Sequence, residues 1–103
     1  MERTIEKHRL EWQGIEIEVR YEARWLNCTD PVFRVAHLEV RAIKPARNPL
    51  PFSETGDRSH FPQVEDVAHE GGPVAYVLAW LDHEAKSPAW REHAARQRQM
   101  SLF

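Results

Sequence analysis

The sequence is poor in cysteine, in net charge and in long apolar runs. Cys28 is the only cysteine among 103 residues, so neither an intrachain disulfide nor a cysteine-based metal cluster can form. One unpaired thiol is typical of a reducing compartment, and we expect a cytoplasmic location. A net charge of −2 disfavours broad non-specific binding to nucleic acid or membranes. The longest apolar run, Pro73 to Leu81, is too short to span a bilayer.

Patterns for catalysis, cofactors and metals are also missing. His69-Glu70 and His83-Glu84 each lack the second histidine that the zinc-protease pattern places four positions after the first. Gly71-Gly72 lacks the glycine spacing and the Lys-Ser/Thr of a phosphate-binding loop. No nucleophile, base and stabilising group assemble in the sequence, so we predict a non-enzymatic protein with no catalytic residue, metal or cofactor.

Alternating apolar and charged residues predict a three-stranded antiparallel meander. Across residues 15–25 the apolar side chains occupy odd positions and charged ones the even positions, which is typical of a strand with one buried face. Gln13-Gly14 supplies a turn that pairs this strand with residues 7–12. A third strand, residues 33–43, changes the phase of its alternation, and this predicts a bulge near Val35-Ala36.

The second half of the chain predicts a loop followed by two helices. Four prolines fall within residues 44–63, and this density excludes a helix or a central strand. Gly71-Gly72-Pro73 starts a helix whose apolar stripe should cross the inner face of the sheet. Ser87-Pro88 starts a second helix, which we expect to reach about Arg98 and to dock by Trp90. The predicted fold class is α+β, with both C-terminal helices packed on one face of the sheet.

The chain finishes on apolar residues that follow a polar, basic run. Its last five residues are Gln99, Met100, Ser101, Leu102 and Phe103. An exposed apolar end is best explained as a surface that a partner buries. We therefore divide the chain into a domain, residues 1–96, and an exposed tail, residues 97–103. In the alternative, Leu102 and Phe103 fold back as the last core contacts of the domain.

This pentapeptide resembles the short motif by which bacterial DNA-metabolism proteins dock on the replication sliding clamp. The motif runs Gln, an aliphatic residue, a small or acidic residue, Leu and Phe, and Met100 stands where Leu is usual. The resemblance implies a non-enzymatic accessory protein that docks on the clamp through Gln99 to Phe103, with Leu102 and Phe103 as its apolar anchor. The second partner, the pathway and the oligomeric state stay open.

Three segments also resemble a group of small uncharacterised proteobacterial proteins. They are Thr55 to Phe61, Gly71 to Val77 and Trp80 to Asp82. This second resemblance covers the globular part and implies no particular activity.

The second hypothesis is a small nucleic-acid-binding domain that uses loop and tail arginines and has a packed C-terminus. Its cationic candidates at the end of the third strand and in the loop are Arg41, Lys44, Arg47, Arg58 and His60. With Phe52 and Phe61 interleaved, they would clamp a phosphate backbone while the rings stack on bases. The simpler interpretation is a solvated loop whose two phenylalanines hold it to the core.

Overall fold

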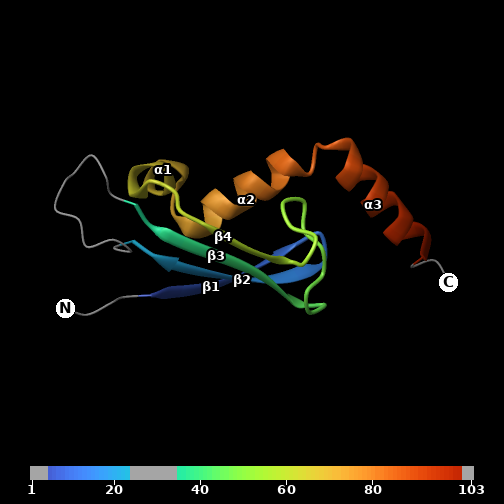
Figure 1. Cartoon of the computed structure of the whole chain (residues 1–103), viewed down its shortest axis with the longest axis horizontal. Coiled ribbons are helices and arrows are strands. Elements are labelled where there is room, and N and C mark those ends of the chain that lie inside the picture. Colours follow the sequence, from blue (N-terminus) through green and yellow to red (C-terminus); the bar gives the residue numbers. More distant parts are fainter. Residues whose placement is uncertain (1–4, 24–34, 101–103) are drawn as a thin grey trace.

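The computed structural model describes residues 5–23 and 35–100 of the chain (Figure 1). Within these residues it has one antiparallel sheet, with strand order β1-β2-β3-β4, and three helices. The strands are β1 (Glu6–Trp12), β2 (Ile15–Glu22), β3 (His37–Lys44) and β4 (Asp57–His60). The helices are α1 (Val64–Glu70), α2 (Pro73–Glu84) and α3 (Pro88–Met100). The predicted α+β class is confirmed.

The first two strands form the hairpin that the alternation predicts. Ile17 and Val19 of β2 are fully buried, whereas Glu16 and Glu18 lie half-buried on the opposite face. A one-residue slip would exchange these two sets, so burial fixes the register. Glu22 departs from the pattern because it is only 4% exposed. The last predicted residues of this strand lie outside the described part of the chain.

The sheet has four strands in the described residues, not the three that the sequence predicted. β4 lies inside the Pro-rich segment and pairs antiparallel with β3 at the edge of the sheet. Its residues, Asp57 to His60, carry no aliphatic side chain, so hydrophobic alternation gave no signal for it. Proline is tolerated beside an edge strand, because no further strand has to pair there.

The pairing irregularity of β3 is at the opposite end from the predicted bulge. Glu16 pairs with Lys44 and Ile17 with Ala42, so Ile43 is the extra residue. The prediction near Val35-Ala36 was wrong. It relied on Phe33, which lies outside the described residues.

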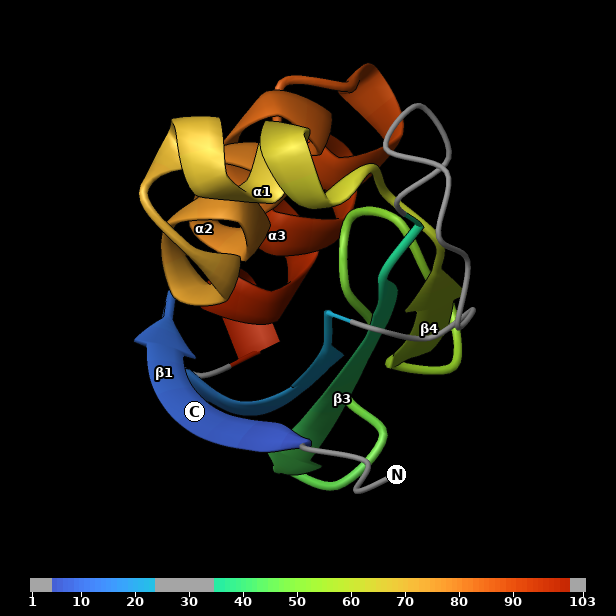
Figure 2. The ribbon, with the colours of Figure 1, turned by 90° about the vertical axis from the view of Figure 1, so that its left-hand side faces the viewer.

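Two helices cover one face of the sheet (Figure 2). α2 begins at Pro73, as predicted, and packs against β1 and β2 with Val77 and Leu81 fully buried. α1, which the sequence patterns did not predict, packs against α2 and buries Val67. Gly71 ends α1 in a left-handed conformation, the usual C-terminal signal of a short helix.

The last helix begins as predicted but does not lie on the sheet. The Ser87 hydroxyl accepts a hydrogen bond from the backbone N–H of Trp90 at 3.2 Å and caps α3. Trp90 is buried, and its ring centroid lies 5.6 Å from that of Trp12. Beyond this contact α3 runs past the end of the sheet to Met100 (Figure 1). The predicted packing of both helices on the sheet face therefore describes α2 alone.

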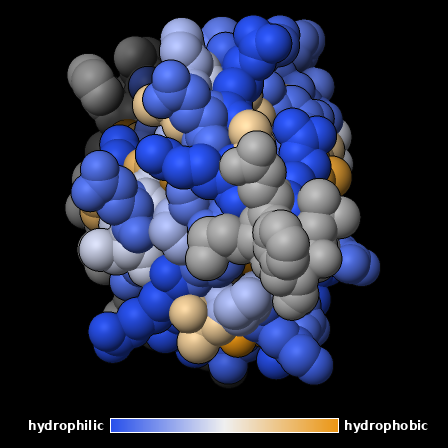
Figure 3. Space-filling view, turned by 90° about the vertical axis from the view of Figure 1, so that its right-hand side faces the viewer, coloured by the Kyte–Doolittle hydropathy of each residue, from blue (hydrophilic) through white to orange (hydrophobic). Residues whose placement is uncertain are grey.

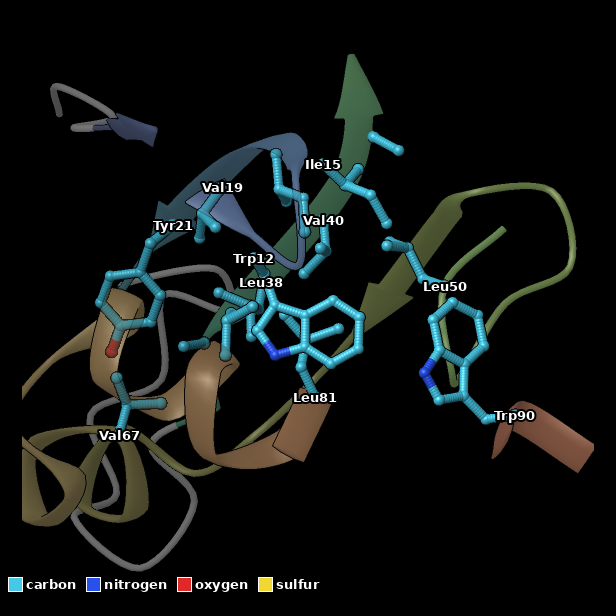
Figure 4. Close-up of a cluster of buried hydrophobic side chains, with 14 residues drawn as sticks. Trp12, Ile15, Val19, Tyr21, Leu38, Val40, Leu50, Val67, Leu81 and Trp90 are labelled. Carbon is cyan, nitrogen blue, oxygen red and sulfur yellow. The ribbon is translucent and has the colours of Figure 1, made fainter. Parts of the chain in front are cut away.

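The core gathers around Trp12 at the end of β1 (Figure 4). Its indole N–H donates to the carboxylate of Asp82 on α2 at 2.9 Å. Val40 from β3 and Leu81 from α2 are fully buried in the same cluster. The sheet, α2 and the start of α3 thus share one hydrophobic core.

Gly56 holds the Pro-rich segment against the end of β3. Its carbonyl accepts from the N–H of Ala42 at 2.7 Å, and its φ is +74°. A Cβ there would lie 2.5 Å from the carbonyl oxygen of Asn48 and 2.8 Å from the carbonyl carbon of Arg47. Gly56 is therefore required both by backbone conformation and by space.

We predict that Gly56→Ala costs about 3 kcal/mol or more of unfolding free energy, because it adds a backbone clash to the strain of positive φ. Gly14→Ala is the matched control: its φ is +77°, but a Cβ there meets nothing within 4 Å. It should cost only about 1 kcal/mol. Urea unfolding of the two variants measures the difference, and equal losses would contradict the close approach.

Candidate functional site

The structure does not bring the five predicted nucleic-acid residues together. Arg41 lies on the outer face of the sheet, where its guanidinium is 4.0 Å from Glu39 and 3.9 Å from Asp57. Arg58 and His60 of β4 pair with Val40 and Leu38, so they share the inner, helix-covered face. These three candidates therefore occupy opposite faces of one sheet.

Arg58 and His60 take part in an aromatic cluster between β4 and α2. Trp80 of α2 lies between two rings, with its centroid 4.1 Å from that of Phe52 and 4.6 Å from that of His60. The Arg58 guanidinium is 5.9 Å from the centroid of Trp80 and donates to the carbonyl of Phe52 at 3.3 Å. Since these groups already contact one another, the cluster joins the edge strand and the Pro-rich segment to α2.

Burial in this cluster shifts two ionisable groups. His60 Nε2 lies 3.1 Å from the Tyr76 hydroxyl. Burial, followed by the charge of Arg58, lowers the pKa of His60 below its ordinary value of 6.5. Burial, followed by the charges of Asp66 and Glu70, raises the pKa of Tyr76. Near pH 7 both side chains are therefore neutral, which suits ring packing better than phosphate binding.

The other two cations lie at the opposite end of β3. Lys44 is the last residue of the strand, and Arg47 follows in a turn where its N–H donates to the carbonyl of Ala42 at 3.1 Å. Both side chains are exposed. They face the same end of the molecule as α3, a proximity that the sequence alone did not indicate.

An open groove of about 970 Å³ runs between α3 and this end of the sheet. Trp90, Arg91 and Ala94 are among the α3 residues that line it. Gly14 of the β1–β2 turn and Pro45 line it from the other side. No sequence pattern indicated the groove, because it depends on where Trp90 fixes α3 relative to the sheet.

The predicted docking peptide includes the last described residues of α3. Gln99 and Met100 belong to the last turn of the helix. Ser101, Leu102 and Phe103 lie outside the described residues, so the choice between an exposed and a packed end stays a prediction. From Trp90 to Met100 the helix advances about 15 Å at its usual rise.

Metal clusters and membrane-spanning helices are absent from the described part of the chain. No group of three or more His, Cys, Asp or Glu side chains in residues 5–23 and 35–100 is placed to hold a metal ion. No helix of these residues has the length and apolar character needed to cross a membrane. Cys28 lies outside them.

A protein family described as the KlcB third domain matches residues 5–90. The chain belongs to this family. No curated protein and no solved structure gives a significant match. The family match ends at Trp90, which is also the residue that packs α3 against Trp12. The KlcB third-domain region thus includes the sheet, α1, α2 and the α3 junction, while residues 91–103 come after it.

The structural role of His60 predicts a pH-dependent stability. Because its pKa is lowered by folding, the unfolded chain binds the proton more readily, and stability should fall as the pH drops below about 6.5. Above that pH, neutral His60 makes its full contribution to folding stability. His60→Gln should therefore lose less stability than the wild type between about pH 7.5 and pH 5.5.

Urea unfolding midpoints at the two pH values provide the measurement. His69→Gln, at an exposed position on α1, is the control and should keep the wild-type response. If His60→Gln responds to pH as strongly as the wild type, the cluster does not exclude the proton as we describe.

Proposed function

We propose that this member of the KlcB third-domain family is a non-enzymatic adaptor that docks on a bacterial DNA sliding clamp through Gln99 to Phe103. The observation that carries the proposal is the common boundary at Trp90, where both the family match and the shared core end. Residues after Trp90 are an addition to the domain, and their final pentapeptide resembles a clamp-docking motif.

The helix supports this proposal by its composition and direction. Beyond Trp90, the α3 residues with described side chains are exposed or half-buried, and Arg91 and Arg96 are among the exposed ones. α3 runs past the end of the sheet (Figure 1), and an arm of this kind would hold a peptide away from the domain. Gln99 and Met100 would have to leave the last helical turn to extend on a partner, at small cost, because helix ends fray.

The energy of docking should come from a few anchors. A short peptide loses conformational freedom on binding, so Leu102 and Phe103 have to fill an apolar pocket, with Met100 beside them. The amide of Gln99 would add directional hydrogen bonds. Arg96 and Arg98 would attract an acidic partner over a longer range, and this part should weaken with salt.

The test is the affinity of the intact chain for a bacterial sliding clamp, which should be in the micromolar range. Leu102→Ala/Phe103→Ala should cost about 2–4 kcal/mol of binding, or roughly 30-fold and more. Its melting temperature should not change, because a docking peptide is not part of the core.

The matched control is Ile5→Ala/Phe61→Ala, which removes the two exposed large apolar side chains found among the described residues, 47% and 52% exposed. This variant should bind the clamp as the wild type does. Two results would reject the proposal: wild-type affinity in Leu102→Ala/Phe103→Ala, or a melting temperature lowered by several degrees, which would identify both residues as core.

A further inference from the structure

The two edges of the sheet, β1 on one side and β4 on the other, are finished differently (Figure 2). At β4, the Ser53 hydroxyl donates to the carbonyl of Asp57 at 2.7 Å and accepts from its N–H at 3.2 Å. At β1, no backbone hydrogen bond within residues 5–23 and 35–100 joins the strand to anything but β2. An edge strand of this kind can pair with another chain.

The hairpin turn decides which residues of β1 present unpaired backbone groups. The turn has two residues, and both have positive φ. In such a turn the flanking residues, here Trp12 and Ile15, form a hydrogen-bonded pair. Bonded and non-bonded pairs then alternate along an antiparallel ladder. Three residues of β1 therefore direct their N–H and C=O groups away from β2: Lys7, Arg9 and Glu11.

The opposite side of the sheet leads to the same assignment. Arg9, Glu18, Arg41 and Asp57 form one row across the four strands. Asp57 directs its backbone groups away from β3, toward Ser53. In each pair both residues point either toward or away from each other, so Arg41 and Glu18 are bonded to each other. Arg9, at the end of the row, therefore points outward.

Two charges of β1 are poorly matched within the chain. Lys7 lies opposite Arg20, and Glu11 lies opposite Glu16. Like charges in these positions destabilise a sheet. Both side chains are exposed, and neither has an ion-pair partner in the described part of the chain. Arg9, midway between them, is 3.1 Å from Glu16.

We propose that β1 pairs antiparallel with β1 of a second copy of this chain, about a two-fold axis at Arg9. Lys7 then lies opposite Glu11 of the second copy, and Glu11 lies opposite Lys7 of that copy. Because the contact is symmetric, it forms two ion pairs at once. The outward backbone groups of both strands join the two four-stranded sheets into one.

The charges favour this register over its neighbours. A shift by two residues in one direction would place Lys7 opposite Arg9, which has the same charge. A shift in the other direction would leave Lys7 opposite Gln13, beyond the end of the strand. In the proposed register the two Arg9 side chains meet at the axis, and each keeps its own Glu16 as a neighbour.

The contact is small, so we expect a weak dimer. It consists of one seven-residue strand from each copy. The space-filling view of the α3 end shows mainly hydrophilic residues (Figure 3). Backbone pairing and charge therefore supply most of the attraction, which should be in the micromolar range and weaken with salt. The surface and the partner differ from those of clamp docking, so the inference goes beyond the proposed function.

Sedimentation velocity of the intact chain at low salt, without any clamp, is the test. Concentrations from about 10 to about 500 µM cover the expected range. Lys7→Glu puts like charges in both intermolecular pairs and should weaken self-association about tenfold or more. Glu11→Lys should do the same for the same reason.

An equimolar mixture of the two variants distinguishes lost pairing from misfolding. Lys7→Glu makes both positions of one strand acidic, and Glu11→Lys makes both positions of the other strand basic. Each position in the mixed dimer therefore faces its opposite charge. The mixture should associate about as tightly as the wild type, although each variant alone does not.

Lys86→Glu is the matched control, because it makes the same charge change at an exposed position between α2 and α3. It should self-associate within about twofold of the wild type. Leu102→Ala/Phe103→Ala should also behave as the wild type does. Since the assay contains no clamp, failure of the docking proposal leaves these results unaffected.

Four results would overturn the inference. They are a monomeric wild type at the highest concentration, wild-type self-association of Lys7→Glu, a mixture that stays monomeric, and an equal loss in Lys86→Glu. Loss of self-association in Leu102→Ala/Phe103→Ala would also contradict it, because the contact would then belong to the tail and not to β1.

Discussion

Trp12 joins the sheet to both C-terminal helices, because its indole N–H donates to Asp82 on α2 and its ring packs against Trp90 on α3. The bond to Asp82 is directional, while Trp90 is held by ring contact, since its buried indole N–H has no acceptor among the described residues. The direction of α3 follows from this contact. The groove between α3 and the sheet depends on that direction.

Local chemistry predicted much of the fold. The alternation along β2, Pro73 at the start of α2 and the Ser87 cap of α3 each indicate an element through its own residues. β4 was missed because it is a polar edge strand, which is stabilised by its pairing with β3 and not by a pattern of its own. The direction of α3 could not be predicted from the residues of the helix alone, because the tertiary contact of Trp90 sets it.

The residues of the candidate sites could not be grouped correctly from the sequence alone either. Nearness in the sequence grouped Arg41, Arg58 and His60, but strand pairing places Arg41 on the opposite face from the other two. Conversely, Gly14 and Arg91 are far apart in the sequence and line one groove. Within the described residues, the exposed large apolar side chains, Ile5 and Phe61, occur before β1 and after β4.

The central claim is that the domain ends at Trp90 and that the residues after it form an arm for a partner. Hydrogen–deuterium exchange of the intact chain, with and without a bacterial sliding clamp, tests it most directly, because exchange reports ordering residue by residue. We expect clamp-dependent protection confined to residues 99–103, with residues 5–90 unchanged. Protection spread over the sheet and α2, or no protection of the final residues, would contradict the account.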